Sequence, residues 1–152
     1  MKLTDYDANK LLSRMPNLKL SYENIHKKVS TDMFFLIPKG KKHIVWFTYF
    51  NDKKVCVFLE INTNIHKKIN NVFIVPQQFE KKIVLGTVFY GTLFFIKTKK
   101  YFSIENIHYY KGKNVEETNE KSKLSLIKYI LENEVKQCFL TNNGIALGLP
   151  II

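Results

Sequence analysis

A length of 152 residues corresponds to a single domain, so we treat residues 1–152 as one unit. The apolar share of 45%, with 12 Phe and 8 Tyr, excludes a disordered chain and provides enough material for a sizeable core. The net charge of +11 favours anionic partners, but Arg14 is the single arginine, so phosphate contacts would depend on lysine point charges with little geometric selectivity.

The sequence carries no signal for export, membrane insertion or metal binding. The N-terminal end contains Asp5 and Asp7 instead of an apolar signal-peptide core, and no apolar run reaches the roughly 18 residues of a membrane helix. Cys56 and Cys138 lie far apart, and the 4 histidines form no metal-binding pair. We therefore expect an intracellular protein of the cytoplasm, nucleus or viral factory, with reduced thiols, no cofactor and no metal site.

The first predicted element is a helix over residues 4–15, because Thr4 can cap it and Leu11, Leu12 and Met15 share one side. Residues 21–29 have helical spacing but remain ambiguous. Strand-like segments rich in β-branched and aromatic residues follow at 33–37, 44–50, 55–61, 72–75, 83–89, 92–96 and 101–109.

Turns and a second helix complete the pattern. Residues 51–54 predict a hairpin turn, and in the strand that follows it alternate residues from Val55 to Ile61 share one face. Residues 122–135 repeat apolar side chains at helical spacing, and residues 138–152 indicate a short strand and turns. We therefore predict one α+β domain with an antiparallel sheet of about seven strands and a helix near each end.

Lysine clusters separate the predicted strands at intervals of about one strand plus one turn. In a simple meander, alternate clusters would gather at the same end of the sheet and form two basic rims. These rims could contact phosphate, or they could be the polar turns of a chain whose Lys-, Asn- and Ile-rich composition follows an AT-rich genome. The clusters are Lys39/Lys41/Lys42, Lys53/Lys54, Lys67/Lys68, Lys81/Lys82, Lys97/Lys99/Lys100 and Lys111/Lys113.

Residues 84–113 contain two segments that resemble consecutive motifs of the covalent nucleotidyltransferases, the mRNA-capping guanylyltransferases and polynucleotide ligases. The first motif has a strand ending in Gly-Thr followed by Asp-Gly-Glu, and the second has an acidic residue in an apolar strand that ends near a glycine. Tyr90-Gly91-Thr92 stands where the family has Asp-Gly-Glu. The matching residues are Gly86, Thr87, Gly91 and Leu93 in the first motif, and Phe102, Ile104, Glu105, Ile107 and Gly112 in the second.

The resemblance covers residues 33–135 and implies the curved antiparallel sheet of this family, with flanking helices. The Pro-X-Gly-Lys turn that begins at Pro38 more closely resembles the snurportin family, import adaptors that use this fold to bind an RNA cap without chemistry. The Lys-, Asn- and Ile-rich composition and the compact single domain also resemble proteins of large DNA viruses, which encode many capping-like proteins. The resemblance therefore implies a protein of such a virus.

The departures from the family pattern concern the catalytic residues. Lys39 or Lys41 could occupy the place of the nucleophile, but neither is followed by the Asp-Gly of the family's Lys-X-Asp-Gly. Glu105 is the one acidic motif residue that remains, and one carboxylate does not hold a divalent ion that needs several oxygen ligands. We therefore expect no catalytic residue, and a protein that is not an enzyme.

Three functions remain open. The first is a catalytically inactive nucleotidyltransferase-like module that binds RNA, an RNA cap or a protein partner. The second is a minor virion structural or assembly protein whose basic rims face capsid proteins or genome, and the third is an active mRNA-capping guanylyltransferase with relocated residues. For the first, Tyr90 stacks on a base or fills the former pocket, and the candidate phosphate contacts are Lys39, Lys41, Lys42, Lys97, Lys99 and Lys100.

Overall fold

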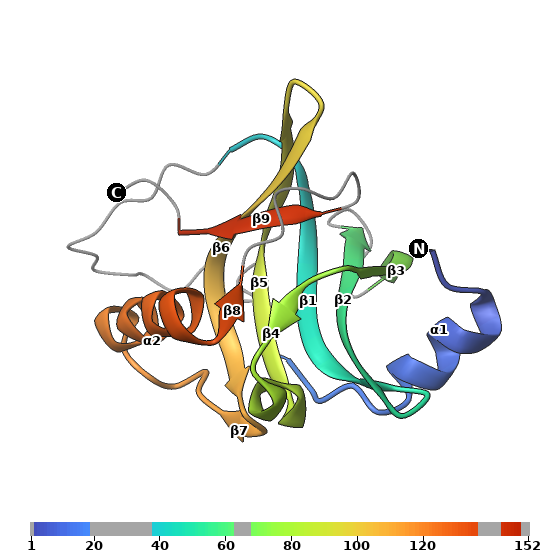
Figure 1. The fold of residues 1–152 in the computed structure, drawn as a ribbon, viewed down its shortest axis with the longest axis horizontal. Helices are drawn as coiled ribbons and strands as arrows, with labels where there is room; N and C mark the ends of the chain where they lie inside the picture. The colour runs from blue at the N-terminus through green and yellow to red at the C-terminus, as the bar shows by residue number, and fades with distance from the viewer. Residues whose placement is uncertain (1, 19–37, 63–67, 137–143, 150–152) are drawn as a thin grey trace.

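The computed structural model describes residues 2–18, 38–62, 68–136 and 144–149. Over these ranges the chain is α+β, with a curled antiparallel sheet in the form of a half-barrel (Figure 1). Its strands follow the order β3-β2-β1-β5-β6-β7, and β9 joins β6 in parallel. The elements are α1 (Asp5–Leu12), β1 (Lys41–Phe50), β2 (Lys53–Asn62), β3 (Lys68–Val75), β4 (Gln78–Phe79), the 3-10 helix η2 (Lys81–Leu85), β5 (Thr87–Ile96), β6 (Lys99–Tyr110), β7 (Lys113–Asn114), α2 (Glu120–Asn133), β8 (Val135–Lys136) and β9 (Ile145–Gly148).

Both α-helices begin at polar caps. The Thr4 side chain accepts a hydrogen bond from the Asp7 amide at 3.2 Å, as predicted, although α1 ends at Leu12 and not at Met15. Asn119 caps α2 in the same way through the Ser122 amide at 2.9 Å. The predictions for residues 21–29 and 33–37, and for Cys138, lie outside the described residues.

The β1–β2 hairpin is tighter than the predicted turn over residues 51–54. Asn51 and Asp52 have positive φ angles of 51° and 63°, which is the geometry of a two-residue type I′ turn. Lys53 and Lys54 already pair with Phe50 and Tyr49 across the hairpin. The strands themselves agree with the prediction.

The predicted strands 83–89 and 92–96 are wrong in two respects. Residues Lys81–Leu85 form the 3-10 helix η2, and Gly86, at φ 124°, turns the chain into the sheet. From Thr87 the strand β5 then continues without a break to Ile96. Buried Ile83 and Val84 explain the error, because a short apolar run does not distinguish a strand from a buried helical turn.

Apolar side chains cover both faces of the sheet. On one face Phe47, Phe58 and Phe89 pack with Ile127 and Ile130 of α2. On the other face, α1 packs its buried Leu11 against a second cluster that contains the β1, β2 and β5 side chains Ile44, Trp46, Val57, Leu59, Val88 and Tyr90. Central strands buried on both sides leave the strand ends and hairpin tips as the places where the sheet can meet a partner.

His43 in β1 should make stability depend on pH. The side chain is 1% exposed, its Nδ1–H donates to the Lys41 carbonyl oxygen at 2.9 Å, and its ring meets the edges of Phe58 and Phe73. Burial lowers the pKa of His43 from its ordinary 6.5. Below pH 6.5 the unfolded chain therefore binds a proton that the folded chain does not, and the free energy of unfolding should fall by up to about 1.4 kcal/mol per pH unit.

Urea unfolding on both sides of this pH, for the wild type and His43→Asn, measures the effect. Asparagine retains a donor toward the Lys41 carbonyl but does not titrate. The loss of stability toward acid should be smaller in the variant, and an equal loss in both proteins would assign the pH dependence to other groups.

Candidate nucleic-acid interface

The strand register brings two of the lysine clusters to one end of the sheet. Lys41 and Lys42 at the start of β1 pair with Leu93 and Thr92 near the end of β5. Because β5 and β6 form a hairpin, Lys97, Lys99 and Lys100 lie just beyond that pairing. Lys39 precedes β1 at the same end, and Gly40 allows the close approach, since a Cβ there would lie 2.2 Å from the Leu93 carbonyl oxygen. The predicted rim of lysines therefore exists in the described residues.

The tip of the β5–β6 hairpin adds exposed apolar side chains to these lysines. Phe95 is 63% exposed and Ile96 is 54% exposed, next to Lys97 and Lys99. The hairpin projects beyond the body of the sheet (Figure 1). We call this surface the upper rim, and its residues are Lys39, Lys41, Phe95, Ile96, Lys97, Lys99 and Lys100.

Phe95 and Ile96 are not among the site residues predicted from the sequence. They end an apolar run that has the composition of a core strand. The signal that could have found them is their position directly before a lysine-rich turn, because side chains at the tip of a two-strand hairpin have no neighbouring strand to cover them.

Lys42 is not part of this accessible surface. Its Nζ donates to Glu105 Oε1 at 2.9 Å and to Thr92 Oγ1 at 2.7 Å, and Thr92 Oγ1 donates to Glu105 Oε2 at 2.5 Å. The side chains of Lys42 and Glu105 are only 24% and 10% exposed. This pairing does not favour the predicted phosphate contact of Lys42, since its charge already neutralises a largely buried carboxylate.

Tyr90 is also withdrawn from solvent. Its side chain is 3% exposed within the core cluster on the α1 side, and Lys42 Nζ lies 5.9 Å from its ring centroid. A ring in this position cannot stack on a base without displacing its neighbours. This burial favours the second role predicted for Tyr90, filling of the former pocket, whereas Phe95 is an exposed aromatic side chain.

Three of the other motif residues, Gly86, Thr87 and Gly112, lie together at the opposite end of the sheet. The Gly112 amide donates to the Gly86 carbonyl oxygen at 2.9 Å, and the Lys111 amide donates to Thr87 Oγ1 at 3.1 Å. Both glycines have positive φ, 124° at Gly86 and 87° at Gly112, which explains the residue type. These contacts join the start of β5 to the end of β6 and are structural.

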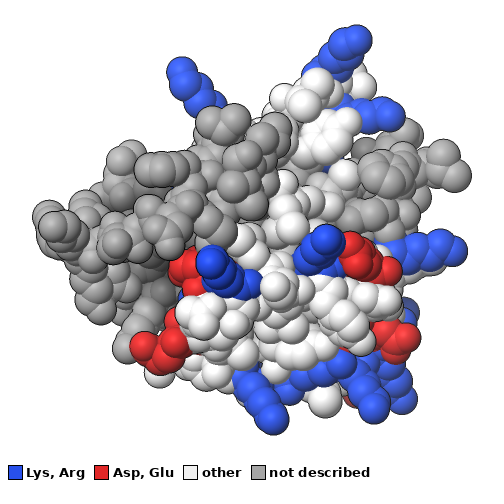
Figure 2. Space-filling model, turned by 90° about the vertical axis from the view of Figure 1, so that its left-hand side faces the viewer, with Lys and Arg blue, Asp and Glu red and all other residues white. Residues whose placement is uncertain are grey.

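Lysines lie at both ends of the sheet, and some of those at the lower end already have partners. At the lower end, Lys111 Nζ lies 2.7 Å from Glu134 Oε2, a contact that raises the pKa of Lys111, and Lys54 Nζ donates to the Phe79 carbonyl oxygen at 2.9 Å. Among the described residues, Lys97, Lys99 and Lys100 have no ion-pair partner. Figure 2 shows basic side chains at the upper and lower ends of one face, with acidic side chains between them. Lys97, Lys99 and Lys100 thus keep their positive charges available, whereas Lys41 Nζ lies 3.7 Å from Glu60 Oε1.

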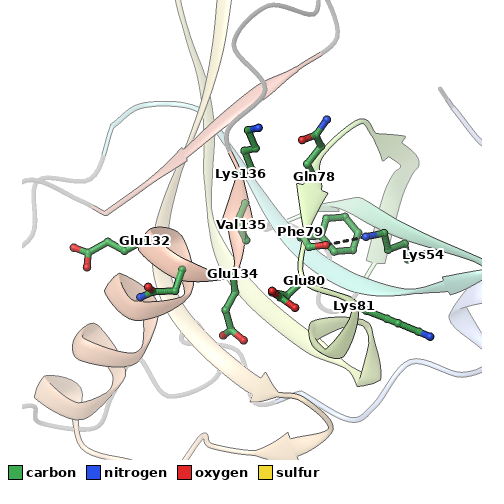
Figure 3. Close-up of a pocket in the computed structure, with 10 residues that line it drawn as sticks. Lys54, Gln78, Phe79, Glu80, Lys81, Glu132, Glu134, Val135 and Lys136 are labelled. Carbon is green, nitrogen blue, oxygen red and sulfur yellow. Dashed lines mark hydrogen bonds between the residues drawn. The ribbon is translucent and has the colours of Figure 1, made fainter.

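A cavity of about 480 Å³ lies between β4, β8 and the end of α2 (Figure 3). Lysine and glutamate side chains both line it, so it favours neither an anion nor a cation. Two of the lining groups already have partners, since Lys54 bonds to Phe79 and Glu134 bonds to Tyr110 and Lys111. The charged lining residues are Lys54, Lys81, Lys136, Glu80, Glu132 and Glu134.

The described part of the chain contains neither a metal site nor a membrane-spanning helix. No group of three or more His, Cys, Asp and Glu side chains there could hold a metal ion, and no helix there is long and apolar enough to cross a membrane. No family model and no curated protein matches the chain.

Proposed function

We propose that this protein is a non-catalytic, nucleotidyltransferase-like module that binds single-stranded RNA through the upper rim. The observation that carries the proposal is the convergence of two lysine clusters, distant in sequence, around the exposed Phe95 at one end of the sheet. Alternating cations and an exposed ring match the alternating phosphates and bases of a single strand.

Each part of the upper rim contributes a different term to RNA binding. The lysines attract phosphates and release counterions, which gives an affinity that falls steeply with salt. Phe95 can stack on any base, because every base has a π face. The absence of arginine from the upper rim predicts little base selectivity, since lysine lacks the planar fork that reads guanine.

The non-catalytic part of the proposal depends on Lys42 and Glu105. Glu105, at the acidic position of the second motif, is held by Lys42 and Thr92. A carboxylate engaged in this way would have to break two hydrogen bonds before it could serve a metal ion or a ribose. Lys39 and Lys41, the two candidates for a nucleophile, are exposed at the start of β1, and Lys41 Nζ lies 3.7 Å from Glu60 Oε1.

Binding of a fluorescent single-stranded RNA over a salt series tests the proposal. Phe95→Ala should weaken binding by roughly 5- to 150-fold, because stacking contributes about 1–3 kcal/mol per base. Lys97→Asn with Lys99→Gln should reduce the slope of log affinity against log salt by about 1.4, since each lost phosphate contact removes about 0.7. Lys97 has a positive φ of 57°, which asparagine adopts more readily, so this variant should fold at least as well as the wild type.

The matched control is Lys121→Gln with Lys128→Gln on the exposed side of α2, which removes the same charge far from the hairpin. The proposal requires the hairpin variants to lose more affinity than this control. Equal losses in both would reduce the lysines to a general charge effect and favour the virion structural function. A capped and an uncapped RNA measured side by side would show whether the cap is recognised, and a covalent nucleotide adduct would support the enzyme instead.

A further inference from the structure

A second cavity lies at the lower end of the sheet, on the α1 side, far from the upper rim. Its volume is about 380 Å³, and it is lined by the segment after α1, the end of β1, the end of η2 with Gly86, and the end of β6 with Gly112. Thr48 in its wall is seven residues along β1 from Lys41, roughly 23 Å at the rise of an extended strand. Any ligand here would therefore be separate from RNA held at the upper rim.

Arg14 is the one positive charge among the described lining residues of this cavity, and no carboxylate is among them. Its guanidinium carbon lies 5.4 Å from the ring centroid of Trp46, so the cation stacks on the indole. Nη1 donates to Thr48 Oγ1 at 3.2 Å, and Nη2 donates to the Tyr49 carbonyl oxygen. A guanidinium has five N–H donors, so these two bonds fix its plane while further donors remain for an anion.

The other walls are flat and largely apolar. Tyr49, Tyr109 and Leu85 line the cavity, and the Leu85 side chain is 63% exposed. Gly86 and Gly112 also line the cavity, through backbone atoms alone. They lie close together, since a Cβ on Gly86 would be 3.5 Å from the Gly112 Cα. The Tyr109 hydroxyl donates to the Asn17 carbonyl oxygen at 3.2 Å, which closes the cavity on the side of the N-terminal segment.

We propose that this cavity, which we call the Arg14 cavity, binds a nucleoside 5′-monophosphate. The planar base lies against the guanidinium that Trp46 supports or against the tyrosine rings, and the remaining Arg14 donors bind the phosphate. The volume is at the lower end of the range for small-molecule sites, which suits one nucleotide better than two. The same chemistry is presented by a free nucleotide and by the 5′-phosphorylated end of an RNA. The proposal does not rest on RNA binding by the upper rim.

Trp46 provides the reporter, because it is the single tryptophan of the chain and forms the floor of the Arg14 cavity. Titration of the full chain with the four common nucleoside 5′-monophosphates should change Trp46 fluorescence and release heat in calorimetry. The matching nucleosides, and inorganic phosphate alone, should bind at least ten-fold more weakly. A nucleoside keeps only the stacking contacts of the base, and inorganic phosphate keeps only the hydrogen bonds to Arg14.

Substitutions at two lining residues test whether the Arg14 cavity is the nucleotide site. Arg14→Lys keeps the charge but loses the fork and the stacking plane, and nucleotide affinity should fall by ten-fold or more. Leu85→Ala truncates an exposed side chain that the fold does not need, and affinity should fall a few-fold. Arg14→Lys could lose affinity because it loosens the attachment of α1. Leu85→Ala, if its urea unfolding matches that of the wild type, then tests the cavity without this effect.

Competition with RNA identifies the source of the nucleotide. The competition uses the Phe95→Ala variant and two short RNAs that differ only in a 5′-phosphate or a 5′-hydroxyl. If only the 5′-phosphorylated RNA displaces the nucleotide, the Arg14 cavity binds RNA ends. Displacement by free nucleotides alone assigns it to a free nucleotide. The proposal is overturned if no 5′-monophosphate binds at millimolar concentration, or if binding is unchanged in both Arg14→Lys and Leu85→Ala.

Discussion

Replacing Gly91 with alanine is expected to destabilise the fold by about 3 kcal/mol or more and to leave a substantial part of the protein unfolded. Gly91 lies in the middle of β5, paired with His43 of β1 on one side and Ile104 of β6 on the other. A Cβ at this position would lie 1.9 Å from the Ser103 carbonyl oxygen and 2.9 Å from its carbonyl carbon. These atoms are backbone of the neighbouring strand, so the clash can be relieved only by separating β5 from β6.

Gly148 in β9 provides the control for this experiment. An added Cβ there meets nothing within 4 Å, and its φ is not in the left-handed region. Gly148→Ala should therefore leave the urea midpoint unchanged or raise it slightly, because alanine restricts the unfolded chain. A Gly91→Ala protein as stable as Gly148→Ala would show that the β5–β6 register, and with it the geometry of the upper rim, is not as described.

Gly91 also shows why the sequence predicted the sheet only in part. Local signals were sufficient for the cap of α1, the β1–β2 hairpin and the alternating face from Val55 to Ile61. A glycine inside an apolar run predicts a break between two strands, whereas Gly91 is required by its close contact with Ser103 on the next strand. Nothing near Gly91 in the sequence encodes that contact.

The strand order could not be predicted either, because it also depends on contacts between strands that are distant in sequence. A simple meander would place each strand beside the next, but β5 pairs with β1 on the side away from β2. The alternation of the lysine clusters nevertheless predicts Lys41 and Lys97 at the same end of the sheet. The structure agrees because residues 87–96 form one strand and not two, and direction along an antiparallel sheet depends only on the number of reversals. The positions of Lys41 and Lys97 at one rim could therefore be predicted, and their distance from each other could not.

Which side chains of the candidate site are accessible depends on what covers the two faces of the sheet. Alternation along β1 and β5 places Lys42 and Tyr90 on the same face, but the sequence does not state that α1 and its core cluster occupy that face. Phe95 is the converse case, because this apolar side chain lies at the tip of the β5–β6 hairpin, where no other described element covers it. The missing information in both cases is tertiary burial.

Lys42→Met should be the second most damaging of these substitutions, with an expected loss of about 3 kcal/mol of unfolding free energy. Methionine fills the volume of the lysine stem but leaves Glu105, which is only 10% exposed, without its cation. Thr92 would remain as a neutral donor to the carboxylate, which is not sufficient to offset the desolvation of the charge. Urea unfolding of Lys42→Met, Glu105→Leu and the double variant forms a double-mutant cycle.

The double variant should recover much of the stability, because replacing both members of a buried pair by apolar side chains is often close to neutral. RNA binding of the folded double variant then separates the two roles of Lys42. If the cluster of Lys42, Thr92 and Glu105 is structural, its RNA affinity should remain near that of the wild type, because a lysine and a glutamate are lost together and the net charge is unchanged. A stable Lys42→Met protein whose RNA affinity falls as far as that of the hairpin variant would instead return Lys42 to the phosphate contacts and place the binding surface across the start of β1.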